Sequence, residues 1–237
     1  MTERVPSVAH PAATVVIVRD GERGCEVLLV RRNSQLAFHG GAWVFPGGRL
    51  DPEDYAGLAE ATDVVAAARN AAMREAREEA GVDLVAESLV PFARWVTPVE
   101  LPKRFDTWFF AGLAAHDNVC VDGGEIHEHR WMHAAEALAA QRAGEIELPP
   151  PTFVTLTGLV PFESAAAALR GLREQAFETF LPRLHLTPDG ACTLYGDDAG
   201  YESGDIDRPG PRHRLSMRGS DWVYERVLDC LRACDCR

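Results

Sequence analysis

The chain has 237 residues, of which 46% are hydrophobic, and its formal net charge is −12. This length suits one large domain with a packed core. The acidic balance argues against a general nucleic-acid binder, because phosphate backbones are held by clustered Lys and Arg. It leaves room for a small anionic substrate held through metal ions. No hydrophobic run approaches the ~20 residues of a membrane span, and the first one is too short for a signal peptide. We therefore expect a cytoplasmic protein whose six cysteines are reduced.

The first third of the chain predicts a hairpin, a turn and one long helix. Residues 13–20 and 25–32 have the composition of strands around the turn GERG. Residues 42–48, AWVFPGG, predict a short strand that ends in a turn. Residues 63–80 are rich in Ala, Arg and Glu and contain no Pro or Gly. Asp63 is a suitable N-cap for this helix and Gly81 a suitable C-terminal stop.

The rest of the chain predicts further strands, followed by helices. Strands are expected at residues 89–98 and 104–114, and a strand with a loop is expected within residues 119–134. Helices are expected at residues 134–144 and 161–180, and a last helix, capped by Ser220, at residues 220–234. Residues 147–152 predict a rigid connector, residues 190–196 a strand and residues 197–214 a long polar loop. Strands on both sides of a central helix indicate an α/β (α+β) layered domain, to which a helical C-terminal extension is added.

Three glutamates share one face of the helix at residues 63–80. Glu75, Glu78 and Glu79 stand at positions i, i+3 and i+4, so their carboxylates occupy one side. A solvated helix with salt bridges such as Arg74 to Glu78 explains part of this pattern, but Glu75 and Glu79 repel each other. The alternative is a site for a hard cation, Mg²⁺ or Mn²⁺, bound through carboxylate oxygens. For the isolated helix both interpretations stay open.

The segment around this helix resembles the signature of the Nudix hydrolases. Residues 74–82, REAREEAGV, match its second half, and Pro46-Gly47-Gly48 resembles the turn that opens it. The chain departs from the family in three ways. Residues 49–73 form a longer segment than usual, Ala76 replaces a bulky aliphatic residue, and the middle glutamate has only Asp51 or Asp54 as candidate substitutes.

The resemblance implies a fold, a reaction and a set of residues. The fold is an α/β/α sandwich around a mixed sheet, which we place at residues 10–148, with residues 149–237 as the extension packed on the same domain. The reaction is Mg²⁺- or Mn²⁺-dependent hydrolysis of a pyrophosphate bond. The implied metal ligands are Glu75, Glu78, Glu79 and the backbone carbonyl of Gly47. Glu78 and Glu79 are also implied to be catalytic. Structural roles are implied for Gly48, Arg74 and Gly81, and Arg74 would orient a glutamate.

A late loop offers two further catalytic candidates, Glu125 and Glu128. Because the other glutamates would be engaged by cations, a separate carboxylate is expected to take the proton from the attacking water. Gly123-Gly124 gives Glu125 a mobile approach, which favours it over Glu128. The alternative is that both are ordinary loop acids.

Residues 28–48 resemble in part the additional signature of coenzyme A (CoA) diphosphatases. Leu28, Leu29, Arg32, Leu36, Gly41 and Phe45 to Gly48 match it, whereas Val30, Asn33, Ala37 and Trp43 do not. We therefore expect a nucleoside diphosphate substrate, preferably CoA or acyl-CoA. A pyrophosphatase of the ADP-ribose or NADH type and a catalytically silent ligand sensor stay open as alternatives.

Three arginines are candidates for binding the phosphates of this substrate. They are Arg31, Arg32 and Arg104. Side chains alternate along a strand, so only one of Arg31 and Arg32 is expected to point inward. No nucleic-acid or membrane partner is expected, and a homodimer is left open.

Overall fold

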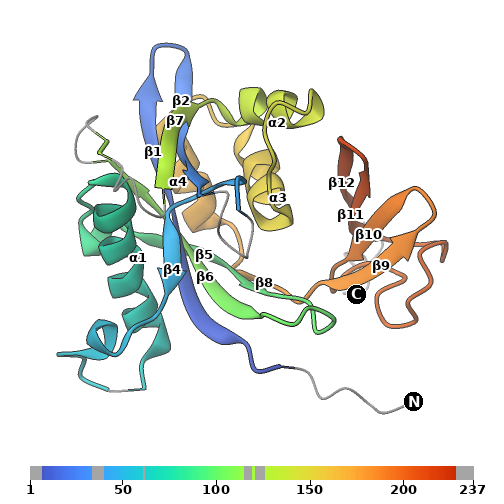
Figure 1. Cartoon of the computed structure of the whole chain (residues 1–237), viewed down its shortest axis with the longest axis horizontal. Helices are drawn as coiled ribbons and strands as arrows, with labels where there is room; N and C mark the ends of the chain where they lie inside the picture. Colours follow the sequence, from blue (N-terminus) through green and yellow to red (C-terminus); the bar gives the residue numbers. More distant parts are fainter. Residues whose placement is uncertain (1–6, 34–39, 61, 115–118, 121–125, 228–237) are drawn as a thin grey trace, which may run out of the picture.

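A mixed sheet organises the chain in the computed structural model, which describes residues 7–33, 40–60, 62–114, 119–120 and 126–227 (Figure 1). Its strands are β1 (His10–Gly21), β2 (Gly24–Arg32), β3 (Trp43–Val44), β4 (Gly47–Arg49), β5 (Val90–Val96), β6 (Phe105–Leu113), β7 (Ile126–Met132) and β8 (Glu178–Phe180). The main path of the sheet runs β3-β2-β1-β6-β5-β8, with β4 also paired to β1 and β7 to β2. The expected hairpin at residues 13–32 is confirmed, because β1 and β2 pair antiparallel from Val18↔Val27 to Gly21↔Gly24.

Strand β1 lies at the centre of this sheet and is shared by several partners. On one side it pairs in parallel with β6 over most of its length, from His10↔Phe105 to Val18↔Leu113. On the other side, β4 pairs with the first part of β1 and β2 with the last part. Strands β4 and β2 pair with different residues along β1, and Gly47 at the start of β4 lies opposite Thr14.

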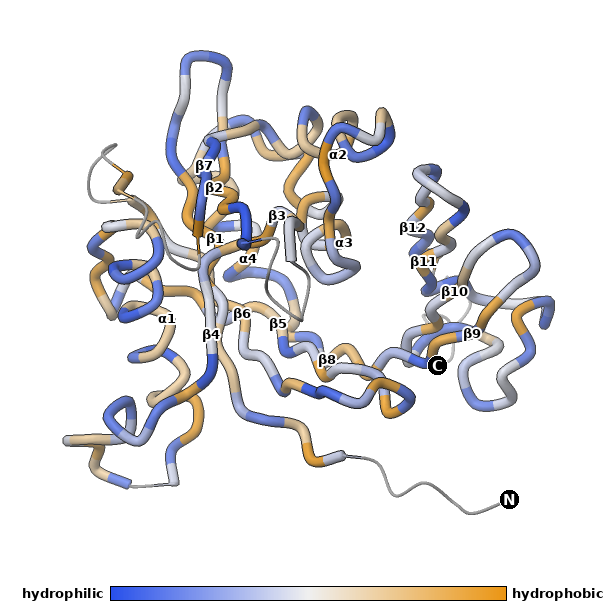
Figure 2. Tube along the Cα trace, in the orientation of Figure 1, coloured by the Kyte–Doolittle hydropathy of each residue, from blue (hydrophilic) through white to orange (hydrophobic). Residues whose placement is uncertain are grey.

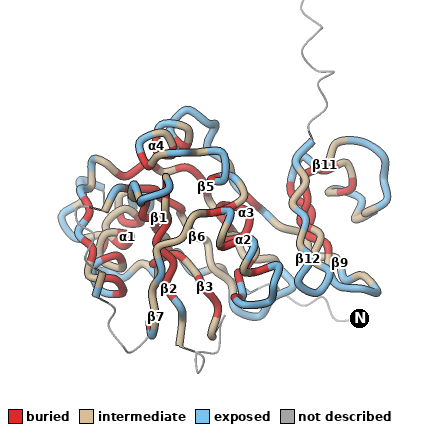
Figure 3. Tube along the Cα trace, turned by 90° about the horizontal axis from the view of Figure 1, so that it is seen from above, coloured by how far each residue is buried: buried red, intermediate tan, exposed pale blue. Residues whose placement is uncertain are grey.

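Helices cover both faces of the sheet. Helix α1 (Val64–Ala80) packs on the face formed by Val15, Ile17 and their neighbours. The alternate residues, including Val16 and Val18, face the opposite core with α2 (Ala134–Arg142), α3 (Pro150–Leu159) and α4 (Ala165–Glu174). In Figure 3 the buried segments run along the sheet between these layers, and in Figure 2 the tip of the β1–β2 hairpin is hydrophilic. The expected α/β/α sandwich is confirmed.

Helix α1 begins and ends at the residues that the sequence predicted. The carboxylate of Asp63 accepts a hydrogen bond from the Ala66 N–H at 3.0 Å, which satisfies one of the free donors of the first turn. Gly81 ends the helix with φ 66°, in the left-handed region that glycine adopts at low cost. Two 3₁₀ turns flank this helix in the sequence, at Pro52–Tyr55 and at Ala86–Ser88.

The C-terminal extension contains helices, but also a second sheet that the sequence did not predict in full. The antiparallel strands β9 (Arg183–Thr187), β10 (Gly190–Leu194), β11 (Arg212–Arg218) and β12 (Asp221–Val227) follow β8 and lie beside the first sheet (Figure 1). The strand expected at residues 190–196 is confirmed as β10. The expected helix at residues 220–234 is wrong over Asp221–Val227, because this segment pairs with β11 along its whole length.

Two other expectations for this region need correction. The helix expected at residues 161–180 is α4, but it ends at Glu174, and residues 178–180 instead pair in parallel with β5. The expected connector at residues 147–152 contains the start of α3, with Pro150 in the first turn, where a missing N–H costs nothing. Among the described helices, none is long and hydrophobic enough to span a membrane.

Candidate active site

The three glutamates of α1 line one pocket of about 640 Å³ between α1 and the sheet. The lining residues are Ala12, Ala13, Thr14, Arg32, Gly47, Gly48, Arg49, Asp51, Arg74, Glu75, Glu78, Glu79, Lys103, Phe105 and Thr107. They come from β1, β2, β4, α1, β6 and the segments next to them. The pocket therefore brings carboxylates and cationic side chains together at one place.

The three carboxylates differ in exposure. Glu79 is only 5% exposed, and its Oε2 accepts a hydrogen bond of 2.9 Å from the backbone N–H of Gly47. Glu78 lies further out, with 59% of its side chain exposed. The sequence resemblance assigned the Gly47 carbonyl to a metal. The structure places Gly47 in the pocket and uses its N–H to position Glu79.

The glycine pair permits the close approach of β4 to α1. A Cβ on Gly48 would collide with the carboxylate of Glu75. A Cβ on Gly47 would lie 2.5 Å from the backbone oxygen of Ala13 in β1. Because only glycine lacks this atom, both glycines allow the strand to pack between β1 and the glutamates.

Arg74 connects the acidic groups of the site. Its Nη1 donates to Glu75 Oε1 at 2.8 Å and to Glu78 Oε2 at 3.0 Å. Its Nε and Nη2 donate to the two carboxylate oxygens of Asp54 at 3.2 and 3.0 Å. The hydrogen bonds to Asp54 are the main cause that raises the pKa of Arg74, so this guanidinium remains charged. Its positive charge offsets the repulsion among the carboxylates that it contacts. The orienting role that the sequence resemblance implies for Arg74 stays a prediction.

Asp54 and Asp51 are the two candidate substitutes for the middle glutamate of the signature, and the structure separates them. Asp54 is 4% exposed and forms the bidentate pair with Arg74. The Asp51 side chain is 56% exposed and lies 3.6 Å from Arg74. The Asp51 N–H donates to Asp54 Oδ2 at 2.8 Å. Asp54 is therefore the main partner of Arg74, and the 3₁₀ turn at Pro52–Tyr55 brings this carboxylate against α1.

Of the three candidate arginines, Arg32 lines the pocket and the other two lie elsewhere. Arg31 pairs with Glu128 at 3.4 Å across the β2–β7 contact. Arg104 donates to the backbone oxygens of Thr97 and Ser7 at 3.0 and 2.7 Å. Lys103, which was not among the predicted site residues, lines the pocket instead. The adjacent Lys103 and Arg104 before β6 indicate positive charge at this end of the strand, but the sequence does not indicate which of the two side chains faces the site.

Glu128 lies in β7 and does not line the carboxylate pocket. Its carboxylate accepts hydrogen bonds from Arg130 at 2.8 and 3.1 Å and from Arg31 at 3.4 Å. These contacts, Arg130 first, lower the pKa of Glu128, which makes it a weaker proton acceptor. Glu125 lies outside the described residues, and its catalytic role stays a prediction.

A second group of possible metal ligands lies in the extension. The ligand atoms of Glu178, Asp197 and His213 all lie within 4.8 Å of one another. Arg226 already pairs with Glu178 at 2.6 Å and Tyr224 contacts the His213 ring at 2.9 Å. Arg226 and Tyr224 thus already engage Glu178 and His213 in a hydrogen-bonded network, so we assign no ion to this group.

Comparison with known proteins places this geometry in a family. The family model described as the NUDIX domain matches residues 8–153, which is more than half of the chain. The chain belongs to the Nudix family. The match includes the first sheet up to β7, helix α1 and every residue that lines the carboxylate pocket.

Nudix proteins from several organisms are similar to this chain. A putative nudix hydrolase 7 of Caenorhabditis elegans is 28% identical over 193 residues, which cover 66% of this chain and 62% of that protein. An acyl-coenzyme A diphosphatase NUDT19 of Xenopus laevis is 30% identical over 128 residues, covering 50% of this chain and 34% of that protein. The chain thus spans less than two thirds of the length of either relative.

A solved structure agrees with the Nudix fold described above. The crystal structure of a NUDIX hydrolase from Alicyclobacillus acidocaldarius has a TM-score of 0.63 and 28% sequence identity. The alignment covers 69% of this chain and 96% of that one. Part of the present chain therefore has no counterpart in that protein.

Proposed function

We propose that the chain hydrolyses the pyrophosphate bond of a nucleoside diphosphate derivative, preferably CoA or acyl-CoA. The observation that carries this proposal is the single pocket in which Glu75, Glu78 and Glu79 lie with Arg32 and Lys103. Such a pocket offers oxygen ligands for cations and positive charge for phosphates. The preference for CoA is supported by the partial signature at residues 28–48 and by the frog relative that is named an acyl-CoA diphosphatase.

The donors of the pocket fit Mg²⁺ or Mn²⁺, because hard cations take carboxylate oxygens. Glu75, Glu78 and Glu79 would hold the ions, and Asp51 is a further carboxylate on the pocket wall. Bound there, a divalent cation would neutralise phosphate oxygens and acidify a water for attack on phosphorus.

The protein's own side chains contribute position and charge. Arg74 holds Glu75 and Glu78 in place through two hydrogen bonds, and the Gly47 N–H holds Glu79. Preorganised groups of this kind need not rearrange during the reaction, which lowers its barrier. Arg32 and Lys103 would bind phosphate oxygens of the substrate. Glu125 is kept as the candidate base.

Replacing Glu79 by Gln tests the proposal. Gln keeps the shape and can still accept the Gly47 hydrogen bond, but it removes one ligand charge. We expect kcat with CoA and Mg²⁺ to fall at least ~10²-fold, the scale of a lost electrostatic stabiliser, without loss of the thermal unfolding transition. The control is Glu53→Gln, which removes an exposed carboxylate outside the pocket. Full activity of Glu79→Gln, or full activity in EDTA, would contradict the proposed metal chemistry.

A substrate panel separates the proposed substrate from its alternatives. CoA should be cut with a higher kcat/KM than ADP-ribose or NADH. Higher rates on the latter would favour the general pyrophosphatase, and binding without turnover of any of the three would favour a sensor. The homodimer and the cytoplasmic location stay predictions.

A further inference from the structure

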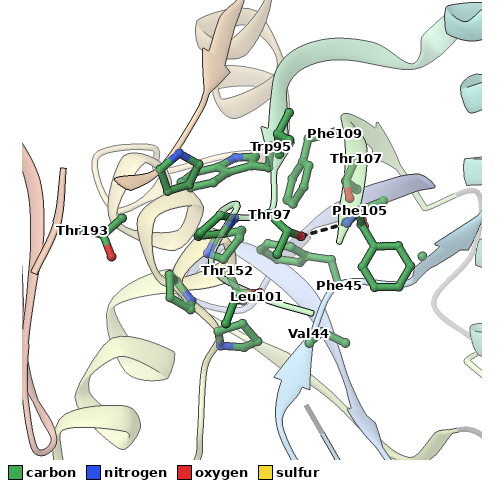
Figure 4. A pocket seen from close by; sticks show the side chains of 18 of the residues that line it. Val44, Phe45, Trp95, Thr97, Leu101, Phe105, Thr107, Phe109, Thr152 and Thr193 are labelled. Atoms are coloured by element: carbon green, nitrogen blue, oxygen red, sulfur yellow. Dashed lines mark hydrogen bonds between the residues drawn. The ribbon is translucent and has the colours of Figure 1, made fainter. Parts of the chain in front are cut away.

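A second, apolar pocket of about 320 Å³ opens beside the carboxylate pocket (Figure 4). Its walls carry the rings of Phe45, Trp95 and Phe109, the side chain of Leu101 and three consecutive prolines, 149–151. Figure 4 shows Trp95 and Phe109 on one side of the pocket, Phe45 and Val44 on another, and Thr193 at the far end. Its volume falls in the range of small-molecule sites.

The two pockets adjoin each other. Among the described residues, five line both of them: Thr14, Arg32, Gly47, Phe105 and Thr107. A molecule whose phosphates lie against Arg32 in the carboxylate pocket can therefore extend into the apolar pocket without leaving the protein surface.

The extension builds the far wall of the apolar pocket. Leu184 of β9, Thr193 of β10, Tyr195 and Met217 of β11 all line it. These residues lie beyond the region that the Nudix family model matches, which ends at residue 153. The extension therefore supplies the far wall of a pocket whose other walls belong to the Nudix domain.

The chemistry of the lining selects the kind of group that binds. Among the described residues that line the apolar pocket, Arg32, at the junction, is the single charged one. A second phosphate or a carboxylate in its interior would lose its hydration without gaining a charged partner, which is costly. The interior thus suits an uncharged, apolar group attached to a phosphate-bearing one.

The aromatic rings around Trp95 form a tightly packed cluster. One face of Trp95 is covered by Phe180, with the ring centroids 3.8 Å apart and the planes 2° from parallel. Phe109 and Tyr195 pack around the same indole, with ring centroids at 6.3 and 5.7 Å. The aromatic surface that faces the pocket is held rigidly by these contacts.

We propose that this pocket binds the acyl chain of an acyl-CoA, while the pyrophosphate lies in the carboxylate pocket. The inference rests on the proposed function and adds to it that the C-terminal sheet selects acylated over free CoA. In acyl-CoA the uncharged pantetheine arm separates the pyrophosphate from the acyl group, so this arm lies along the shared wall of the two pockets. The acyl end then reaches the far wall, between the proline segment and β9, β10 and β11, where burial of its methylenes contributes to binding.

The kinetic test compares CoA, butyryl-CoA and octanoyl-CoA under the same Mg²⁺ concentration. We expect kcat/KM to rise with chain length by up to about 4-fold per methylene, the ratio that corresponds to the transfer of one methylene out of water. The rise should stop when the pocket is filled. A flat series, with CoA still cut, would overturn the inference and leave the proposed function standing.

Two matched variants on β9 locate the effect. Leu184→Phe adds volume inside the pocket, whereas Leu186→Phe adds the same volume at a side chain that is 84% exposed and outside it. We expect the ratio of the octanoyl-CoA to the CoA kcat/KM to fall at least ~10-fold in Leu184→Phe, on the scale of a disturbed apolar fit. In Leu186→Phe it should equal the wild-type ratio. An equal ratio in all three proteins would overturn the inference.

A binding measurement decides the case in which no CoA compound is cut. S-octanoylpantetheine, which carries the acyl chain without a nucleotide, is titrated calorimetrically into the full chain in EDTA. Binding that is at least ~10-fold weaker in Leu184→Phe than in Leu186→Phe supports the pocket even if the proposed substrate is wrong. Absence of binding to the wild-type chain overturns the inference even if CoA is cut.

Discussion

Arg74 forms ion pairs with four acidic side chains of the site, and Asp54 is its main partner. The carboxylate of Asp54 is buried and receives two hydrogen bonds from the guanidinium. Its backbone oxygen also accepts a hydrogen bond from Asn70 of α1 at 2.8 Å. The segment between β4 and α1 is thus fastened to the helix at the point where the glutamates begin.

Removal of Asp54 should therefore affect both stability and activity. We expect Asp54→Ala to lower the free energy of unfolding by about 3 kcal/mol, because it leaves a partly buried guanidinium without its main partner. Hydrolysis should also fall, since Arg74 no longer fixes Glu75 and Glu78. Urea denaturation and steady-state kinetics would measure both effects.

Asp51→Ala is the matched control for this prediction. Asp51 is exposed and lies 3.6 Å from the same guanidinium, so its loss should cost at most about 1 kcal/mol, as for a surface pair. Equal losses of stability in the two variants would show that Asp54 has no special role.

At this scale, the sequence predicted residue types better than residue positions. The shared face of Glu75, Glu78 and Glu79 could be predicted because helical spacing fixes which side chains lie on one side, whereas the role of Arg74 followed from the family resemblance alone. The choice between Asp51 and Asp54, or between Lys103 and Arg104, depends on how an irregular segment or a strand entrance is oriented. No period in the sequence encodes that orientation.

Helix α1 carries the three glutamates of the site, and Gly81 ends this helix two residues after Glu79. Gly81 has a positive φ, and a Cβ there would lie 3.2 Å from the Cβ of Cys120. An L-residue with a side chain is disfavoured in this conformation, and here it would also crowd the neighbouring segment.

We expect Gly81→Ala to lower the free energy of unfolding by about 1–2 kcal/mol, the cost of a left-handed conformation. The control is Gly158→Ala in α3, where a Cβ meets open space. In a helix that substitution should be neutral or stabilise by up to about 1 kcal/mol. Thermal denaturation of both variants measures the difference, and the prediction is wrong if Gly158→Ala is the more destabilising change.

Elements with a clear local pattern were predictable, and elements defined by distant partners were not. Asp63 and Gly81 mark the ends of α1 in the sequence itself. Residues 221–227 resemble a helix because of the serine before them, yet Trp222, Val223, Tyr224 and Val227 are residues that favour strands, and β11 provides a partner. Likewise residues 178–180 continue the helical sequence pattern of α4, but they form strand β8 because they pair with the edge of β5.

At the scale of the whole molecule, the hydrogen-bonded network around His213 in the second sheet makes the stability of the fold depend on pH in the acid range. His213 is 1% exposed, and burial, assisted by Arg226, lowers its pKa to about 4. Tyr224, Glu178 and Arg226 surround it. The folded chain thus holds a neutral histidine between pH 6.5 and 4, where the unfolded chain holds a protonated one.

Because the unfolded state binds more protons in that window, the free energy of unfolding should fall as the pH drops from 6.5 to 4, by at most about 3 kcal/mol from this residue. Below pH 4 both states are protonated and the contribution no longer changes. Carboxylates add their own acid dependence, so the informative quantity is a difference between variants.

His213→Gln should therefore show a smaller loss of melting temperature between pH 6.5 and 4 than the wild type. His127→Gln, which alters an exposed histidine of β7, should follow the wild-type curve. Parallel curves for all three proteins would rule out His213 as the source.

The parallel pairing of β1 with β6 also has a consequence for how the chain reaches its native state. His10 must find Phe105, and β5 must later find β8 near Phe180. Such distant pairs cost loop entropy before any contact compensates for it. During synthesis, the hydrophobic strand β1 remains without its parallel neighbour until residue 113 has left the ribosome. The nascent chain therefore exposes an unpaired strand edge for much of its translation, which is the condition under which chaperones bind and aggregation begins.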